Sequence, residues 1–394
     1  MYIYIFNPVF KWLGFGLNLV LLGVSFFYAF LNFVETKRYL KAYRHEIWII
    51  LFIISFLFLR IQTATTQEGY DEVFRVVDML LSQLLIPMFI VRFVLIKCKE
   101  AGFYNIMITV GVVAALITLV CALSPAVNMF VRGLQTDREF SGMSTTSQME
   151  LGYRCFGLAT NLTSAYGYMM GVFGSLCLVQ MKSRWHYFLF VILFLFAAAV
   201  NARTGMMAIF VTLFLLAFNS AYSLSIKQML LIFVFIAAVF FGYNSLKVYL
   251  PSTYDFISSF VDFISDSNNY EGSYYDRNLH FPKTSDGIIW GEGINIYGTN
   301  SIYSSDIGFV RNVYLGGFFF IGLLLIHQFV LYKKMIRRSG DFIFIIGLAI
   351  SVLIFHYKGL VLYTSSAISR FVMLYYFVLV YNELHKKSKI LLYK

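Results

Sequence analysis

Charge is scarce in this chain. Asp, Glu, Lys and Arg make up only 13% of its 394 residues, whereas apolar residues make up 59%. A soluble domain usually carries roughly 25% charged residues, so this composition excludes a soluble globular protein. It is typical of an integral membrane protein.

Cysteine is sparse as well. The chain has four, at Cys98, Cys121, Cys155 and Cys177. No two have the short spacing of a metal or redox motif. Cys121 and Cys155 flank one predicted outer loop, where they either pair or remain buried thiols. The outer-side histidines, His280 and His356, have no metal-ligand neighbour three or four residues away, so we expect no metal site.

Long apolar runs recur along the whole chain, and each is near the ~20 residues that cross a bilayer core. The first run, Leu13 to Phe33, is too long for the apolar part of a signal peptide and lacks a clear cleavage site, so we interpret it as a span. The fold class that follows is an all-α integral membrane bundle of about eleven transmembrane helices. The predicted spans are 12–33, 47–62, 77–96, 103–123, 156–179, 187–201, 204–220, 228–246, 306–331, 341–357 and 365–382.

The basic residues gather in every second connection between these spans. The net charge of +11 is therefore not a nucleic-acid patch, and we expect no nucleic-acid partner. Basic residues mark cytoplasmic loops, which puts the C-terminus inside a bacterial inner membrane and the N-terminus on the periplasmic side. The cytoplasmic set is Lys37, Arg38, Lys41, Arg44, Arg92, Lys97, Lys99, Lys182, Arg184, Lys227, Lys333, Lys334, Arg337, Arg338, Lys386, Lys387, Lys389 and Lys394.

Two outer connections are long, at residues 124–155 and 247–305, within a single membrane domain that covers residues 1–394. Loops of this length usually have a function or are disordered. The second is rich in tyrosine, which disordered segments lack, and we expect it to contain short helices. A third connection is short. A single helix over residues 187–218 would be about 48 Å long, whereas the hydrocarbon core is ~30 Å thick. We therefore expect the chain to turn at Asn201–Gly205.

Several cations lie at the outer ends of the spans, against the positive-inside trend. Each either snorkels to the interface, pairs with an acid such as Glu150, or binds an anion. As a group they suit a pyrophosphate, which guanidinium groups grip in bidentate fashion, and thus a polyprenyl-diphosphate-linked substrate. The six are Arg154, Arg203, Arg277, Arg311, Lys358 and Arg370.

Three segments carry a resemblance to a known family. They are Tyr153–Leu158 with Asn161, then Asn201-Ala202-Arg203-Thr204-Gly205, and then Trp290-Gly291-Glu292-Gly293 followed by Ser305–Phe309 and Gly316-Gly317. Their spacing over about residues 150 to 380 resembles that of the bacterial O-antigen polymerases, the Wzy-type repeat-unit polymerases, and more distantly the O-antigen ligases. Ligases usually have a histidine where this chain has Asp306, which favours a polymerase.

The resemblance implies a glycosyl transfer in the periplasm. The growing glycan moves from undecaprenyl diphosphate to a hydroxyl of the incoming lipid-linked repeat unit, with no metal, nucleotide or other cofactor. Besides this substrate and membrane lipids, it implies a chain-length regulator and a flippase as partners. A lipid-linked oligosaccharide flippase remains the main alternative function, with an O-antigen ligase as another, because both also handle a lipid diphosphate.

The chemistry assigns roles to particular residues. Cations placed where the diphosphate leaves stabilise the transition state more than the ground state, which favours Arg154 and Arg203, then Arg311 and Arg370. Asp306 is the leading general base. The alternative is that Asp306 only caps the following span, which stabilises a helix by about 0.5–2 kcal/mol. The remaining candidates are His280 as second base, Arg277 beside it, and Lys358 and Asn161 for substrate binding.

Overall fold

The computed structural model describes residues 1–64, 70–93, 99–135, 139–140, 143–144, 155, 157–159, 163–181, 184–219, 278–296 and 305–392. The predicted eighth span at 228–246, most of loop 247–305, and the candidates Arg154, Asn161 and Arg277 lie outside the described residues. For Arg203 only the backbone is described. The predictions for these side chains stay predictions.

The regular secondary structure of the described residues is helical except for one pair of two-residue strands. The first part holds α1 (Tyr2–Phe6), α2 (Leu17–Leu31), α3 (Phe33–Ala42), α4 (Arg44–Gln62), α5 (Tyr70–Phe93), α6 (Glu100–Leu123), α7 (Pro125–Leu134), β1 (Glu139–Phe140) and β2 (Met143–Ser144). The second part holds α9 (Thr163–Gln180), α10 (Tyr187–Asn201), η1 (Arg203–Gly205), α11 (Met206–Ala217), α15 (Ser285–Trp290), α16 (Gly308–Arg338), α17 (Phe342–Lys358) and α18 (Ala367–Leu392).

Within the described ranges, five helices are long and apolar enough to cross a membrane: α4, α5, α6, α16 and α18. The consecutive helices α2 and α3 make a sixth if the pair, bent by 106°, is taken as one span. The prediction of an all-α membrane protein is confirmed at this level, and the count of eleven spans stays a prediction. The predicted interruption of the helix at Asn201–Gly205 is confirmed, because η1 separates α10 from α11 there, and the reversal of direction stays a prediction.

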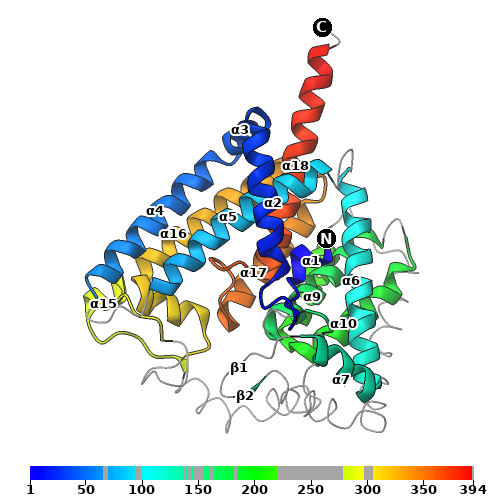
Figure 1. Cartoon of the computed structure of the whole chain (residues 1–394), viewed down its shortest axis with the longest axis horizontal. Coiled ribbons are helices and arrows are strands. Elements are labelled where there is room, and N and C mark those ends of the chain that lie inside the picture. Colours follow the sequence, from blue (N-terminus) through cyan, green and yellow to red (C-terminus); the bar gives the residue numbers. More distant parts are fainter. Residues whose placement is uncertain are drawn as a thin grey trace.

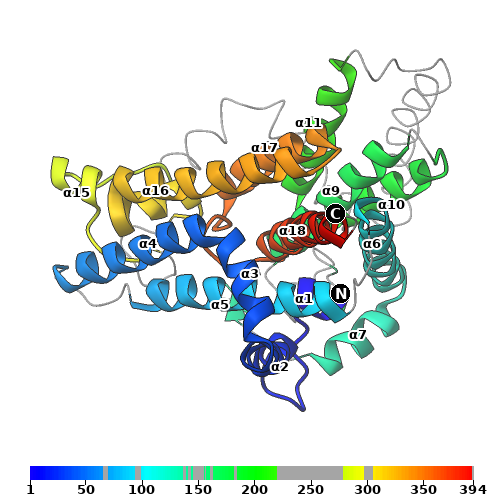
Figure 2. The same cartoon turned by 90° about the horizontal axis from the view of Figure 1, so that it is seen from above.

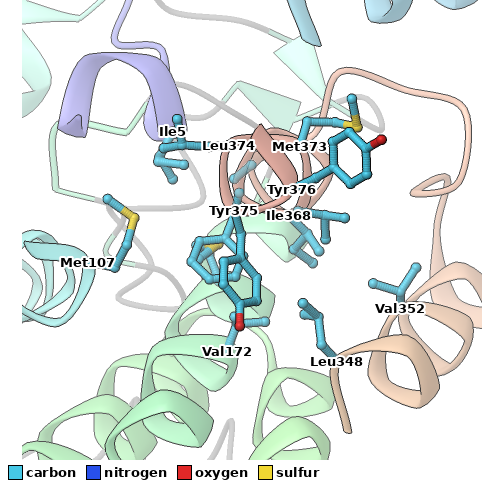
Figure 3. Close-up of a cluster of buried hydrophobic side chains, with 14 of the residues drawn as sticks. Ile5, Met107, Val172, Leu348, Val352, Ile368, Met373, Leu374, Tyr375 and Tyr376 are labelled. Carbon is cyan, nitrogen blue, oxygen red and sulfur yellow. The ribbon is translucent and has the colours of Figure 1, made fainter. Parts of the chain in front are cut away.

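Helix α18 forms the centre of the bundle. Figure 2 shows it nearly end-on, with α5, α9, α16 and α17 around it. Its residues from Phe371 to Tyr381 are all buried, because neighbours cover every face of the helix. In Figure 3, Ile5 of α1, Met107 of α6, Val172 of α9 and Leu348 of α17 lie around the α18 side chains. A helix that is apolar all round fits only such a central place.

The connections predicted to lie on opposite sides of the membrane are found at opposite ends of the molecule. Figure 1 shows α3 and the C-terminus at the top, and α7 and α15 toward the bottom. Helix α3 turns sharply out of the line of α2 and keeps the cations Lys37, Arg38 and Lys41 exposed. We call the end with α3 the basic end and the end with α15 the loop end. Which of them faces the cytoplasm stays a prediction.

Candidate functional site

A break in α16 organises the loop end. Gly317 has φ 69° and ψ −172°, a backbone conformation that only glycine adopts readily, so the helix is interrupted there. The interruption frees the carbonyl of Tyr314, which accepts hydrogen bonds from the amides of Glu292 (2.7 Å) and Gly293 (3.1 Å). Freed backbone at membrane depth requires such partners.

The short helix α15 fits into this break. It begins with a side-chain cap, in which the Gly287 amide donates to Thr284 Oγ1 at 3.0 Å, and it ends at Gly291 with φ 80°. A Cβ on Gly291 would lie 2.5 Å from the amide nitrogen of Gly316. Gly291 and the Gly316-Gly317 pair, from two parts of the segment that carried the resemblance, therefore lie against each other.

Arg60 ties this junction to α4. Its Nε donates to the carbonyl of Gly291 at 2.8 Å, and Nη2 donates to the same oxygen. Neither Arg60 nor Arg75 is among the cations predicted from the sequence. Both are cations near loop-end helix termini, and under the predicted topology they run against the positive-inside trend, so the pattern that singled out the other arginines also includes them.

A buried carboxylate, Glu72 of α5, gathers the next group of polar side chains. Its Oε1 lies 2.8 Å from Arg75 Nη1 and 3.9 Å from Arg311 Nη2. Asn295 bridges the pair, donating to Glu72 Oε1 at 2.7 Å and accepting from Arg311 Nη2 at 3.3 Å. The Glu72 side chain is only 1% exposed. A buried carboxylate needs compensation of this kind, and removing one partner typically costs about 3–5 kcal/mol.

Tyr363, in the connection between α17 and α18, interacts electrostatically with Glu72 and its arginine partners. Burial raises the pKa of its hydroxyl well above the ordinary value, and the negative charge of Glu72 adds to the rise. The hydroxyl therefore remains protonated at neutral pH. It offers a neutral donor beside the carboxylate.

His356 links α16 to the connection after α17. Its Nδ1 accepts from the amides of Val361 (3.1 Å) and Leu362 (3.4 Å), which leaves the proton of a neutral ring on Nε2. Nε2 lies 2.7 Å from the side-chain amide of Asn312. Its partner should then be the amide oxygen of Asn312, an exchange of O and N that such assignments allow. We assign His356 an architectural role.

The two candidate bases lie on segments that are bonded to each other. The amide of Asp306 donates to Asn278 Oδ1 at 2.9 Å, and Ser305 Oγ donates to the carbonyl of Asn278 at 2.7 Å. His280 follows two residues later, with its ring centroid 5.7 Å from that of Tyr314. Residues far apart in the sequence thus meet at the start of α16.

The structure also bears on the capping alternative for Asp306. Helix α16 begins at Gly308 with Ile307 at the cap position, and no side chain caps it. The Ile307 amide instead donates to Ser305 Oγ at 3.1 Å. The Asp306 side chain is exposed. Capping of α16 therefore does not account for this carboxylate.

Two of the predicted diphosphate ligands are buried. Arg370 donates from Nη1 to the carbonyls of Tyr4 (3.4 Å) and Ile5 (3.2 Å) and from Nε to Ser365 Oγ (3.1 Å). It thereby fastens α1 inside the bundle. Arg311 is held by the Glu72 group described above. Lys358 ends α17 and is exposed.

The tight turn that contains Arg203 is anchored by Asn201. This side chain is buried, donates to the Ala197 carbonyl at 2.9 Å and accepts from the Cys155 amide at 3.1 Å. Residues 155 and 201, from two of the segments that carried the resemblance, are thus in contact. Cys155 and Cys121 share a small apolar cluster, and both are free thiols, which favours the unpaired alternative.

Comparisons with known proteins add no identification. No model of a known protein family matches the chain, and no curated protein matches it. Within the described ranges, no three His, Cys, Asp or Glu side chains gather as a metal site would require.

Proposed function

We propose that this chain is a metal-independent integral membrane glycosyltransferase that polymerises lipid-diphosphate-linked oligosaccharide repeat units outside the cytoplasm. The observation that carries the proposal is the junction at the start of α16. An exposed carboxylate, Asp306, is bonded through its backbone to the segment that holds His280, and the 46% exposed cation Arg75 shares Glu72 with Arg311 of the first turn of α16. Transfer of a glycan from a lipid diphosphate requires a proton acceptor and cations near the membrane boundary.

The proposed reaction is a single displacement at the anomeric carbon of the donor. The oxygen of an acceptor hydroxyl forms a bond to this carbon while the bond from the carbon to the diphosphate oxygen breaks. Asp306 takes the hydroxyl proton, a contribution of roughly 10²- to 10⁴-fold. The polyprenyl diphosphate leaves with the bonding electron pair, and preorganised guanidinium groups stabilise the negative charge that it gains.

The contacts divide the arginines into two groups. Arg311 and Arg370 already bind Asn295 and backbone carbonyls, so we assign them as positioning residues. Arg203 and Arg154 remain the proposed diphosphate ligands. Arg75 joins them as a new candidate, because its side chain is 46% exposed although it pairs with Glu72.

One observation favours the flippase alternative. Broken helices with freed backbone groups line the substrate sites of many transporters. In α16, however, the carbonyl freed by the break already accepts from Glu292 and Gly293, so the break serves to hold α15. We therefore keep the polymerase as the first proposal.

A reconstitution experiment distinguishes these functions. The purified chain is placed in proteoliposomes with undecaprenyl-diphosphate-linked repeat units, a chelator and no nucleotide. The proposal requires a ladder of lipid-linked glycans of increasing length. Movement of single units between leaflets without a ladder identifies a flippase, and transfer that occurs only to an added lipid A-core acceptor identifies a ligase.

A further inference from the structure

A groove lies between α16 and α17 toward the basic end, away from the candidate site. Its volume is about 510 Å³, within the roughly 300–1,000 Å³ of known ligand pockets. Most of its wall is apolar and comes from both helices, with Phe329 and Ile336 on one side and Ile350 and Leu353 on the other. These four side chains are exposed, and Figure 2 shows α16 and α17 at the periphery of the bundle. The groove is therefore open at the surface of the described helices, with apolar side chains along it.

Two cations, Lys333 and Arg337, line the end of this groove. The acids nearby are already engaged, because Glu46 pairs with Lys334 at 2.6 Å and Glu383 pairs with Arg338 at 2.7 Å. Among the residues that the structure describes, Lys333 and Arg337 form no ion pair. The groove thus carries two positive charges that no described carboxylate balances.

A second cavity adjoins this charged end. It has a volume of about 480 Å³ and is lined by Lys334, Arg337, Arg338, Leu379, Asn382 and Glu383. Arg337 lines both spaces, so the apolar groove adjoins a polar, basic recess at the basic end of the bundle. The retention of positive charge on one side of the membrane explains cations at this end. Positive charge retained on one side of the membrane does not explain why Lys333 and Arg337 lie at the end of an apolar groove.

We propose that this groove binds one anionic phospholipid. An acyl chain lies between α16 and α17, and the phosphate lies against Arg337 and Lys333. Basic recesses between membrane helices recognise anionic head groups in this way. The site is separate from the proposed glycan chemistry, and the inference does not depend on it.

The test compares two lipids on the full-length chain. Native mass spectrometry from detergent measures binding of phosphatidylglycerol and phosphatidylcholine with identical acyl chains. Each cation near an anionic lipid surface favours binding by roughly fivefold, so we expect a preference for phosphatidylglycerol of roughly 30-fold. Equal binding of both lipids would overturn the proposal, and this comparison needs no variant.

Variants then locate the site. Lys333→Gln with Arg337→Gln should lower the preference to near one. The matched control is Lys37→Gln with Lys41→Gln, which removes two exposed cations from α3 at the same end and away from both cavities. Equal loss in the control pair would mean that general surface charge, and not this groove, selects the lipid.

Two further measurements test the two halves of the site. Ala349→Trp fills the groove and should weaken phosphatidylglycerol binding, whereas unchanged binding shows that the acyl chain lies elsewhere and refutes the proposal. Glycerol phosphate has the charge without the chain and should fail to displace bound lipid at millimolar concentration. Displacement by it would identify a simple anion site.

Discussion

Gly317→Ala tests whether the break in α16 holds the candidate site together. Gly317 has φ 69° and ψ −172°, where any other residue is strained by about 1–3 kcal/mol. The new methyl group would also overlap the carbonyl oxygen of Ile289, which is backbone and cannot turn away. Overpacking of this kind adds typically about 1–3 kcal/mol. The sum is a loss of about 2–6 kcal/mol of stability.

The same helix offers a matched control. Gly322 lies five residues further along α16, and a Cβ there meets nothing within 4 Å. Gly322→Ala should therefore be neutral or should stabilise the helix by up to about 1 kcal/mol. Both variants add one methyl group to one apolar helix, so they differ only in backbone conformation and in the contact with α15.

Thermal unfolding of the purified proteins in detergent, followed by tryptophan fluorescence, measures the difference. Gly317→Ala should unfold well below the wild type, and Gly322→Ala should unfold at or above it. Under the proposed function, Gly317→Ala also loses polymerisation, since displaced α15 releases Glu292 and Gly293 from Tyr314. Equal midpoints for the two variants would refute the role assigned to the break.

Three other predictions follow from the loop end and the topology. Asp306→Asn should fold normally, because the side chain of Asp306 is exposed. This variant should lower the rate of polymerisation by at least about 10²-fold. The control variant Asp286→Asn, on α15, should keep full activity. Arg311→Met should destabilise the protein by about 3–5 kcal/mol, and adding Glu72→Gln should restore much of it, as double-variant unfolding would show. Ser285→Cys in a cysteine-free chain should react with an impermeant maleimide on intact cells, and Ser388→Cys only after permeabilisation; the reverse pattern inverts the topology.

Several features follow from local sequence alone. The apolar runs predict helices at 103–123 and 187–201, and the structure has Glu100–Leu123 and Tyr187–Asn201. The interruption at Asn201–Gly205 is equally local, because one helix of that length exceeds the bilayer. Basic residues in every second connection predict that the connections containing α3 and α15 lie at opposite ends of the bundle. The structure places α3 and α15 at opposite ends (Figure 1).

The bend after the first long run escaped this reasoning. The apolar run predicts one span over 12–33, whereas α2 begins at Leu17 and ends at Leu31, and the chain then turns by 106° into α3. Hydropathy records how apolar a stretch is and carries little information about its direction. The path of such a segment depends on what it packs against.

The partners of the charged residues were decided only by the tertiary structure. From sequence, Arg311 and Arg370 are cations near the outer ends of spans, which suit an external anion as well as an internal partner. In the fold, Arg311 meets Glu72, more than 200 positions away, and Arg370 meets the carbonyls of α1 at the other end of the chain. A buried charge takes whichever partner the packed helices present. That choice depends on helix packing across the whole chain, whereas hydropathy and charge alternation depend only on neighbouring residues. The sequence by itself therefore determined the membrane class and the approximate helices. Only the tertiary structure decided which side chains meet at the candidate site.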